Sequence, residues 1–166
     1  EGLDMVVTGP DGEALDLPLV DGKRKGIGMH SYCSVTYDIA GKGYSRFESW
    51  VGANHLKEYN NSMIFKVYFD NETEPRYTSP AMSYLVPAEF ISLDLTGVRT
   101  IRLELDSNGS INGDHGNWAD AKFLSYEEIP EETGVALGLE APETVEAGSE
   151  FEVKGTIGGL DALESP

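Results

Sequence analysis

Residues 63–70 alternate between two faces more regularly than any other part of this 166-residue chain. One face is apolar throughout, and the other mixes apolar with polar side chains. A period of two residues is the signature of a β-strand, and apolar residues on both faces suit a strand within a sandwich of two sheets. The two faces consist of Met63, Phe65, Val67 and Phe69, and of Ile64, Lys66, Tyr68 and Asp70.

Further strand patterns follow one another along residues 1–126. Turns rich in glycine, asparagine and aspartate separate these patterns, and no stretch with helical period and caps competes with them. Short strands at regular spacing predict an all-β fold, an antiparallel β-sandwich or barrel. The predicted strands cover residues 34–39, 44–53, 63–70, 76–79, 90–95, 100–105 and 118–126, with a short one at 5–7.

The composition changes after Tyr126, which predicts a domain boundary. Residues 1–126 form the predicted sandwich, and residues 127–134 form an acidic linker with proline and glycine. Residues 135–166 contain two strand patterns, at 135–139 and 150–154, similar to the opening of an immunoglobulin-like or cohesin-like module. Two strands cannot bury a core alone, so we interpret the chain as an excised piece of a longer, multimodular protein.

The charge of the chain restricts its partners. The net charge is −17, and residues 127–166 carry 11 of the 29 acidic residues but one of the 12 basic ones. No basic stripe is present, so neither nucleic acid nor an anionic membrane surface is an expected partner. The single cysteine, Cys33, excludes an intrachain disulfide; we expect it to be a small buried apolar residue rather than a nucleophile.

Residues 112–120 are predicted to form a polar loop that leads into the last strand. The loop carries Asp114, His115, Trp118 and Asp120. Chain reversal alone requires glycine, asparagine and aspartate, so the histidine and tryptophan favour a binding function. The alternative is a turn whose tryptophan packs in the core and whose histidine lies at the surface.

Several segments together resemble a known family. They are Gly26-Ile27-Gly28-Met29-His30, Ser34-Val35-Thr36-Tyr37-Asp38-Ile39, Tyr44-Ser45-Arg46-Phe47, Trp50-Val51-Gly52, Phe65-Lys66-Val67-Tyr68, Thr78-Ser79-Pro80-Ala81-Met82 and Asp114-His115-Gly116-Asn117-Trp118-Ala119-Asp120-Ala121. Over about residues 20–126 the chain resembles the NPCBM family, carbohydrate-binding module family 51. The resemblance implies a β-sandwich of jelly-roll, galactose-binding-domain-like type. It also implies a module without catalytic activity that holds a secreted or cell-surface bacterial glycoside hydrolase on galactose-containing glycans.

The chain departs from the family pattern at two places. An acidic pair often follows the Val-Gly step in the family, whereas residues 52–58 read Gly-Ala-Asn-His-Leu-Lys-Glu here. A ligand contact supplied by that segment could therefore be altered. The first strand of the family is also poorly represented in residues 1–19.

A neutral sugar needs side chains that both donate and accept hydrogen bonds, together with an aromatic face. We predict a small sugar pocket at one end of the sandwich. For the histidines the alternative is a turn or core position, and for Trp118 its place at a strand start favours core packing. The predicted carbohydrate-binding residues are His30, Asn54, His55, Asp114, His115, Asn117 and Trp118.

A structural calcium ion is usual in sandwiches similar to this family. Asp120 lies where such sandwiches have an acidic calcium ligand, and calcium requires six to eight oxygen ligands. Asp11, Asp16 and Asp21, in the N-terminal turns, could supply more of them. The alternative is that all four are solvated surface carboxylates.

Two other functions compete with sugar binding. A glycosidase would use Asp114 with His115 or Asp120 as its acid–base groups, and it would need a deep cleft. A structural or protein-interaction sandwich that has lost sugar binding would need neither. A pocket plugged by residues 54–60 would favour this structural or interaction role.

Overall fold

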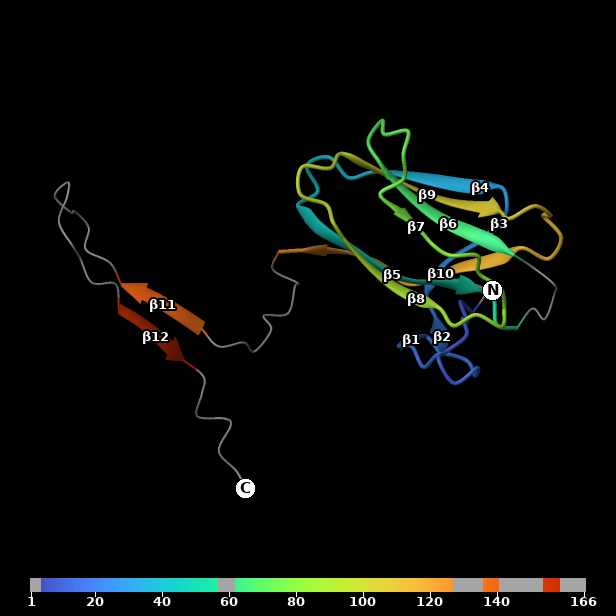
Figure 1. Cartoon of the computed structure of the whole chain (residues 1–166), viewed down its shortest axis with the longest axis horizontal. Helices are drawn as coiled ribbons and strands as arrows, with labels where there is room; N and C mark the ends of the chain where they lie inside the picture. The colour runs from blue at the N-terminus through green and yellow to red at the C-terminus, as the bar shows by residue number, and fades with distance from the viewer. Residues whose placement is uncertain (1–3, 57–61, 127–135, 141–153, 159–166) are drawn as a thin grey trace, which may run out of the picture. The chain divides into compact units, whose positions relative to one another are not determined.

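The computed structural model describes residues 4–56, 62–126, 136–140 and 154–158, and it forms two compact units, Glu1–Ile129 and Pro130–Pro166 (Figure 1). Every element assigned in these residues is a β-strand. The strands of the first unit are β1 (Leu19–Val20), β2 (Lys23–Arg24), β3 (Gly26–His30), β4 (Cys33–Asp38), β5 (Tyr44–Ala53), β6 (Met63–Phe69), β7 (Tyr77–Thr78), β8 (Glu89–Asp94), β9 (Thr100–Ser107) and β10 (His115–Ser125).

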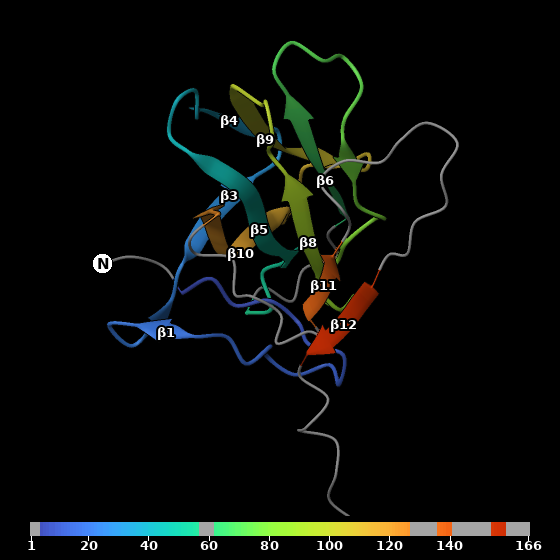
Figure 2. The ribbon, with the colours of Figure 1, turned by 90° about the vertical axis from the view of Figure 1, so that its left-hand side faces the viewer.

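Two four-stranded antiparallel sheets make up the body of the first unit. One has the strand order β3-β10-β5-β8 and the other β4-β9-β6-β7, while β1 and β2 form a separate hairpin. Figures 1 and 2 show the two sheets as two layers, one above the other. The predicted all-β antiparallel sandwich is therefore confirmed.

The core lies between the sheets, where the predicted alternation places the apolar side chains. Phe65 and Val67 of β6 face Phe47 and Val51 of β5, and all four side chains are buried. Trp118 of β10 packs its ring edge-on against Phe65, with 5.1 Å between the ring centroids. Burying each side chain of this size stabilises the fold by about 1.5–3 kcal/mol, so the inner faces fix which side of each strand points outward.

The N-terminal segment covers part of the outer face of the β3-β10-β5-β8 sheet. Met5, Val7 and Leu17 form a small buried cluster with Ala119 of β10, and the segment, blue in Figure 2, runs beneath this sheet. Gly52 lets it approach, because a Cβ there would lie 3.3 Å from the Cβ of Val7. We call residues 4–17 the N-terminal strap.

The structure corrects the prediction for residues 112–120. Strand β10 begins at His115, three residues before the predicted start, because its first five residues pair with β3 in the register His115↔His30 to Ala119↔Gly26. The segment Gly26–His30, which we did not predict as a strand, forms β3. More than half of the predicted loop is thus the paired start of a central strand.

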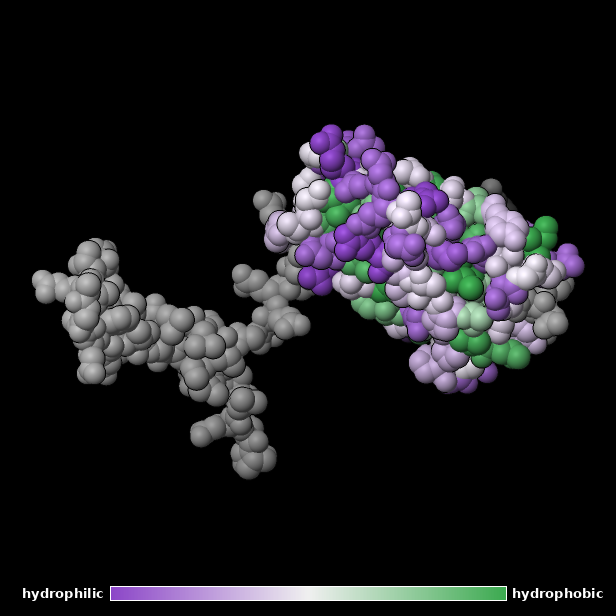
Figure 3. All heavy atoms as spheres, turned by 45° about the horizontal axis from the view of Figure 1, so that its top comes forward, coloured by the Kyte–Doolittle hydropathy of each residue, from purple (hydrophilic) through white to green (hydrophobic). Residues whose placement is uncertain are grey.

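The outer face of the β4-β9-β6-β7 sheet is mostly hydrophilic (Figure 3). Arg102 lies over the ring of Tyr68, 3.9 Å from its centroid, and donates to Glu104 at 2.7 Å, while Lys66 pairs with Asp106. Arg102 and Glu104 thus pair along β9, whereas Lys66 of β6 and Asp106 of β9 pair across two neighbouring strands. The prediction that Cys33 is buried is wrong, since this residue at the start of β4 is exposed.

The second unit contains two described strands. These are β11 (Ala136–Glu140) and β12 (Lys154–Gly158), which pair with each other in antiparallel register, Ala136↔Gly158 to Glu140↔Lys154. The prediction for residues 135–139 agrees with β11 within one residue, whereas β12 begins where the predicted strand at 150–154 ends. The predicted linker at 127–134 lies outside the described residues. The extent of the second module stays a prediction.

Two carboxylates accept hydrogen bonds in turns, and their lowered pKa values indicate how the stability of the fold depends on pH. Backbone N–H groups of Thr100 and Arg99 lower the pKa of Asp70, and the hydroxyl and N–H of Thr96 lower the pKa of Asp94. The stabilisation is complete above the unfolded-state pKa of about 3.9 and is lost as pH falls through the lower folded-state values.

Urea unfolding measured from pH 6 down to pH 2–3 tests this expectation. The urea midpoint of the wild type should fall at the acid end, and the fall should be smaller in Asp70→Ala. Parallel curves for the two proteins would contradict the role of Asp70.

Candidate functional site

Three of the predicted residues lie side by side at one end of the β3-β10-β5-β8 sheet. His30, the last residue of β3, pairs with His115, the first residue of β10. Asn54 follows the end of β5 and donates its backbone N–H to the His115 carbonyl at 2.8 Å. We call His30, His115 and Asn54 the polar row, since each lies at the end of a different one of three adjacent strands.

The polar row faces away from the core. A Cβ at Gly116 would lie 2.8 Å from side-chain atoms of Leu105 and Phe65, so position 116 points inward. Successive side chains of a strand alternate between faces, and His115 therefore points outward. Its cross-strand neighbours His30 and Asn54 share that face, where His30 is exposed and the other two are partly exposed.

The two imidazoles of the row touch each other. Their ring centroids are 5.0 Å apart with an interplanar angle of 83°. His30 Nδ1 lies 2.7 Å from the Ser31 carbonyl oxygen, which can only accept a hydrogen bond. Nδ1 of His30 therefore carries the proton, and the neutral ring keeps a lone pair on Nε2.

His55 lies next to the polar row and is held by the N-terminal strap. Its backbone N–H donates to the Val6 carbonyl at 3.1 Å, and its Nδ1 lies 3.0 Å from Thr8 Oγ1. The side chain of Asn54 accepts from the Leu56 N–H through Oδ1 at 3.0 Å, which leaves its amide nitrogen to donate. The segment after Leu56, which includes the departure from the family pattern at residues 57 and 58, lies outside the described residues.

Asp114 does not join the polar row. Its side chain has no exposed surface; Oδ2 accepts from the Ser31 hydroxyl at 2.7 Å and Oδ1 from the Ser62 N–H at 3.2 Å. The carboxylate ties the turn after β3 to the start of β6. As placed, it cannot contact a sugar or act as the acid of a glycosidase, which requires access to a bound substrate.

Asn117 and Trp118 also lie away from the row. Asn117 is buried under the N-terminal strap and donates to the Val6 carbonyl at 2.9 Å. Trp118 is fully buried in the core, as the alternative interpretation held, although it is the fourth residue of β10 rather than the start of a strand. Both residues hold the scaffold on which the polar row lies.

The four predicted calcium ligands do not gather. In the part of the chain that the structure describes, no three histidine, cysteine or acidic residues are grouped so that they could hold a metal ion. Asp120 instead accepts from Lys122 at 3.1 Å, and Asp21 lies 3.9 Å from Lys25. These carboxylates do not form a calcium site by themselves, and the structural calcium ion stays a prediction.

A thermal melt with and without a chelator tests the calcium prediction directly. Because no three ligating side chains are grouped in the described residues, we expect the same midpoint in both. A lower midpoint in chelator would mean that calcium binds through other oxygens of the chain.

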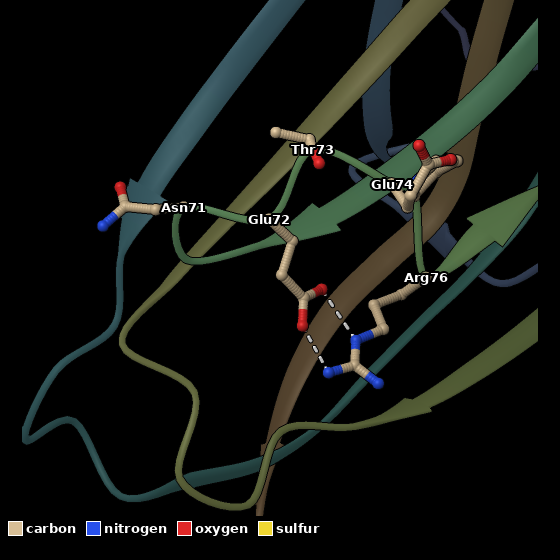
Figure 4. Close-up of a pocket in the computed structure, with 6 residues that line it drawn as sticks. Asn71, Glu72, Thr73, Glu74 and Arg76 are labelled. Atoms are coloured by element: carbon tan, nitrogen blue, oxygen red, sulfur yellow. Dashed lines mark hydrogen bonds and ion pairs between the residues drawn. The ribbon is translucent and has the colours of Figure 1, made fainter.

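A hollow of about 540 Å³ lies in the β6–β7 connection, where residues 71–76 line it (Figure 4). It is formed by a single loop in which Glu72 and Arg76 make a bidentate ion pair. None of the predicted binding residues lines it. We therefore assign the candidate site to the polar row, whose groups match the chemistry of sugar hydroxyls.

Comparison with known proteins identifies the family. The model of the NPCBM/NEW2 domain matches residues 5–124. The chain belongs to this family. Its members are carbohydrate-binding modules without catalytic activity, so the match confirms the predicted resemblance and the prediction of a non-catalytic module.

Solved structures of the NPCBM/NEW2 relatives support the same assignment. The CBM51 module of a Clostridium perfringens GH95 protein, solved in complex with methyl-galactose, shares 29% identity with a TM-score of 0.64 over 73% of this chain and 80% of that one. The CBM51-2 and INT domains of C. perfringens ZmpB, solved in complex with GlcNAc, share 30% identity with a TM-score of 0.63 over 74% of this chain and 25% of that one.

One curated relative is a much longer protein. It is a Renibacterium salmoninarum protein named "Putative endo-alpha-N-acetylgalactosaminidase", 30% identical over 143 residues, which is 85% of this chain and 9% of the relative. The chain thus spans about a tenth of its length. Because 85% of 166 residues exceeds the first unit, the similarity extends into the second unit.

Sequence reasoning missed the residues that support the site. Thr8 and Val6 of the strap hold His55, while Ser31 and Ser62 hold Asp114. Tyr32, which follows His30 by two residues, is 71% exposed and accepts from the Ser107 hydroxyl at 2.8 Å.

Proposed function

We propose that this chain is a carbohydrate-binding module that binds galactose-containing glycans through the polar row. The observation that carries the proposal is the outward-facing row of His30, His115 and Asn54 at the ends of three adjacent strands. Family membership and a relative solved with methyl-galactose support it. The module would hold a parent glycoside hydrolase on its glycan, outside the bacterial cell.

The polar row suits a neutral sugar because its groups are complementary to hydroxyls. A hydroxyl both donates and accepts, so an imidazole lone pair and an amide N–H can engage two neighbouring hydroxyls of one ring. Shallow sites of this kind bind in the millimolar to micromolar range, about −4 to −8 kcal/mol.

No helix in the described residues is long and apolar enough to cross a membrane.

Titration of the chain with methyl-galactose tests the proposal. His30→Ala and His115→Ala should each weaken binding at least about tenfold, equivalent to about 1.4 kcal/mol, because each removes one hydrogen-bonding group from the row. Glu74→Ala, in the β6–β7 hollow, is the control and should bind as the wild type does. Thermal melts should show that all three variants are folded.

Two outcomes would contradict the proposal. If neither the methyl-galactose titration nor a glycan array shows binding by the wild type, the chain is a structural or interaction module that has lost sugar binding. If the wild type binds and His115→Ala binds equally well, the ligand lies elsewhere. Loss of binding in Glu74→Ala would move the site to the β6–β7 loop.

A further inference from the structure

The hydroxyl of Thr8 makes two hydrogen bonds that together fix a proton on His55. Thr8 Oγ1 lies 2.8 Å from the Tyr84 carbonyl oxygen and 3.0 Å from His55 Nδ1. The carbonyl can only accept, so the single hydroxyl hydrogen of Thr8 goes to Tyr84. Oγ1 must then accept from His55, and Nδ1 of His55 must carry a hydrogen.

Thr8 is held rigidly enough to impose this choice. The residue is 2% exposed, and its backbone carbonyl accepts from the Ala88 N–H at 2.8 Å. His55 is fixed in turn by its own N–H, which donates to Val6. A freely rotating hydroxyl could either donate to or accept from His55 Nδ1, and would therefore suit either tautomer of His55. Because the Thr8 hydrogen is donated to the Tyr84 carbonyl, Oγ1 can only accept from His55, which suits the Nδ1–H tautomer alone.

We propose that Thr8 is a positioning residue that fixes the tautomer of His55 beside the polar row, so that Nε2 of the neutral His55 ring is an acceptor for hydroxyls of a ligand bound to the row. His30 has the same tautomer through the Ser31 carbonyl, and Asn54 presents an amide donor. The site thus offers fixed acceptors beside a fixed donor, a pattern complementary to hydroxyls of a neutral sugar. The inference rests on the proposed function only for this last step.

Long-range ¹H–¹⁵N correlation spectra of the labelled, ligand-free chain read which imidazole nitrogen carries the proton. The chain has three histidines, so a His55→Ala spectrum assigns the His55 pattern. At about pH 8, where histidine side chains are ordinarily neutral, His55 should be the Nδ1–H tautomer in the wild type and in Thr8→Ser. In Thr8→Val, which keeps the shape but removes the hydroxyl, it should shift towards Nε2–H.

His30 is the internal control and should keep its Nδ1–H tautomer in every variant. Methyl-galactose affinity should fall about tenfold in Thr8→Val and change less than about twofold in Thr8→Ser. An Nε2–H tautomer of His55 in the wild type overturns the inference even if Thr8→Val does not fold. A wild type that shows the expected tautomer but binds no glycan would instead refute the proposed function and leave the role of Thr8 standing.

Discussion

Replacing Gly26 with alanine is expected to lower the free energy of unfolding by about 3 kcal/mol or more. Gly26 has φ +151°, and a Cβ there would lie 2.1 Å from the Trp118 carbonyl oxygen and 3.0 Å from Ala119 Cα. These are backbone atoms of β10, so no side-chain rotation relieves the overlap. The first residue of β3 would have to separate from β10, and His30 lies at the other end of the same short strand.

Gly28→Ala is the matched control, two residues along the same strand. A Cβ at Gly28 would lie 3.4 Å from Met5 Sδ and 3.5 Å from Asn117 Oδ1, ordinary contact distances. We expect a change within about 1 kcal/mol. Urea unfolding of both variants measures the difference, and methyl-galactose titration should show weaker binding for Gly26→Ala alone. Equal stability would mean that β3 does not approach β10 as closely as the structure shows.

The strands that sequence reasoning found are those whose burial has a period of two. The predicted strand at 44–53 coincides with β5, and the predicted apolar face of β6, with Phe65 and Val67 at its centre, is buried. Strand β3 was missed because glycine is depleted in strands. Its glycines are needed for close approach, Gly26 to the backbone of β10 and Gly28 to the strap, and only the tertiary structure reveals that approach.

Only part of the site could be predicted, because only the tertiary structure shows which polar groups are used within the fold. His30, His115 and Asn54 stand at the ends of three strands that the fold brings together. Asp114 and Asn117 carry equally suitable groups but use them internally. Their partners are distant in sequence, at Ser31, Ser62 and Val6, 83, 52 and 111 residues away. A polar group that binds a ligand and one that binds the scaffold have the same chemistry, so residue type alone cannot separate them.

Asp114→Ala is expected to be the second strongly destabilised variant, by about 2–4 kcal/mol. It leaves the Ser31 hydroxyl and the Ser62 N–H without their acceptor, and each unsatisfied donor costs about 1–3 kcal/mol where it is buried. Ser31 is buried, whereas Ser62 is partly exposed. The turn that follows His30 would lose its tie to β6, so sugar binding should weaken as well. Urea unfolding and methyl-galactose titration measure the two effects.

Asp114→Asn separates a supporting role from direct contact with the ligand. The amide oxygen can still accept from Ser62, and the amide nitrogen can donate to the Ser31 hydroxyl, so the loss of stability should be about 1 kcal/mol. If the carboxylate only supports the scaffold, methyl-galactose affinity should stay within about threefold of the wild type. A hydrogen bond to a charged group contributes about 1.5–3 kcal/mol. A stable Asp114→Asn variant that binds more than tenfold more weakly would therefore put this carboxylate in contact with the sugar, against its burial in the structure.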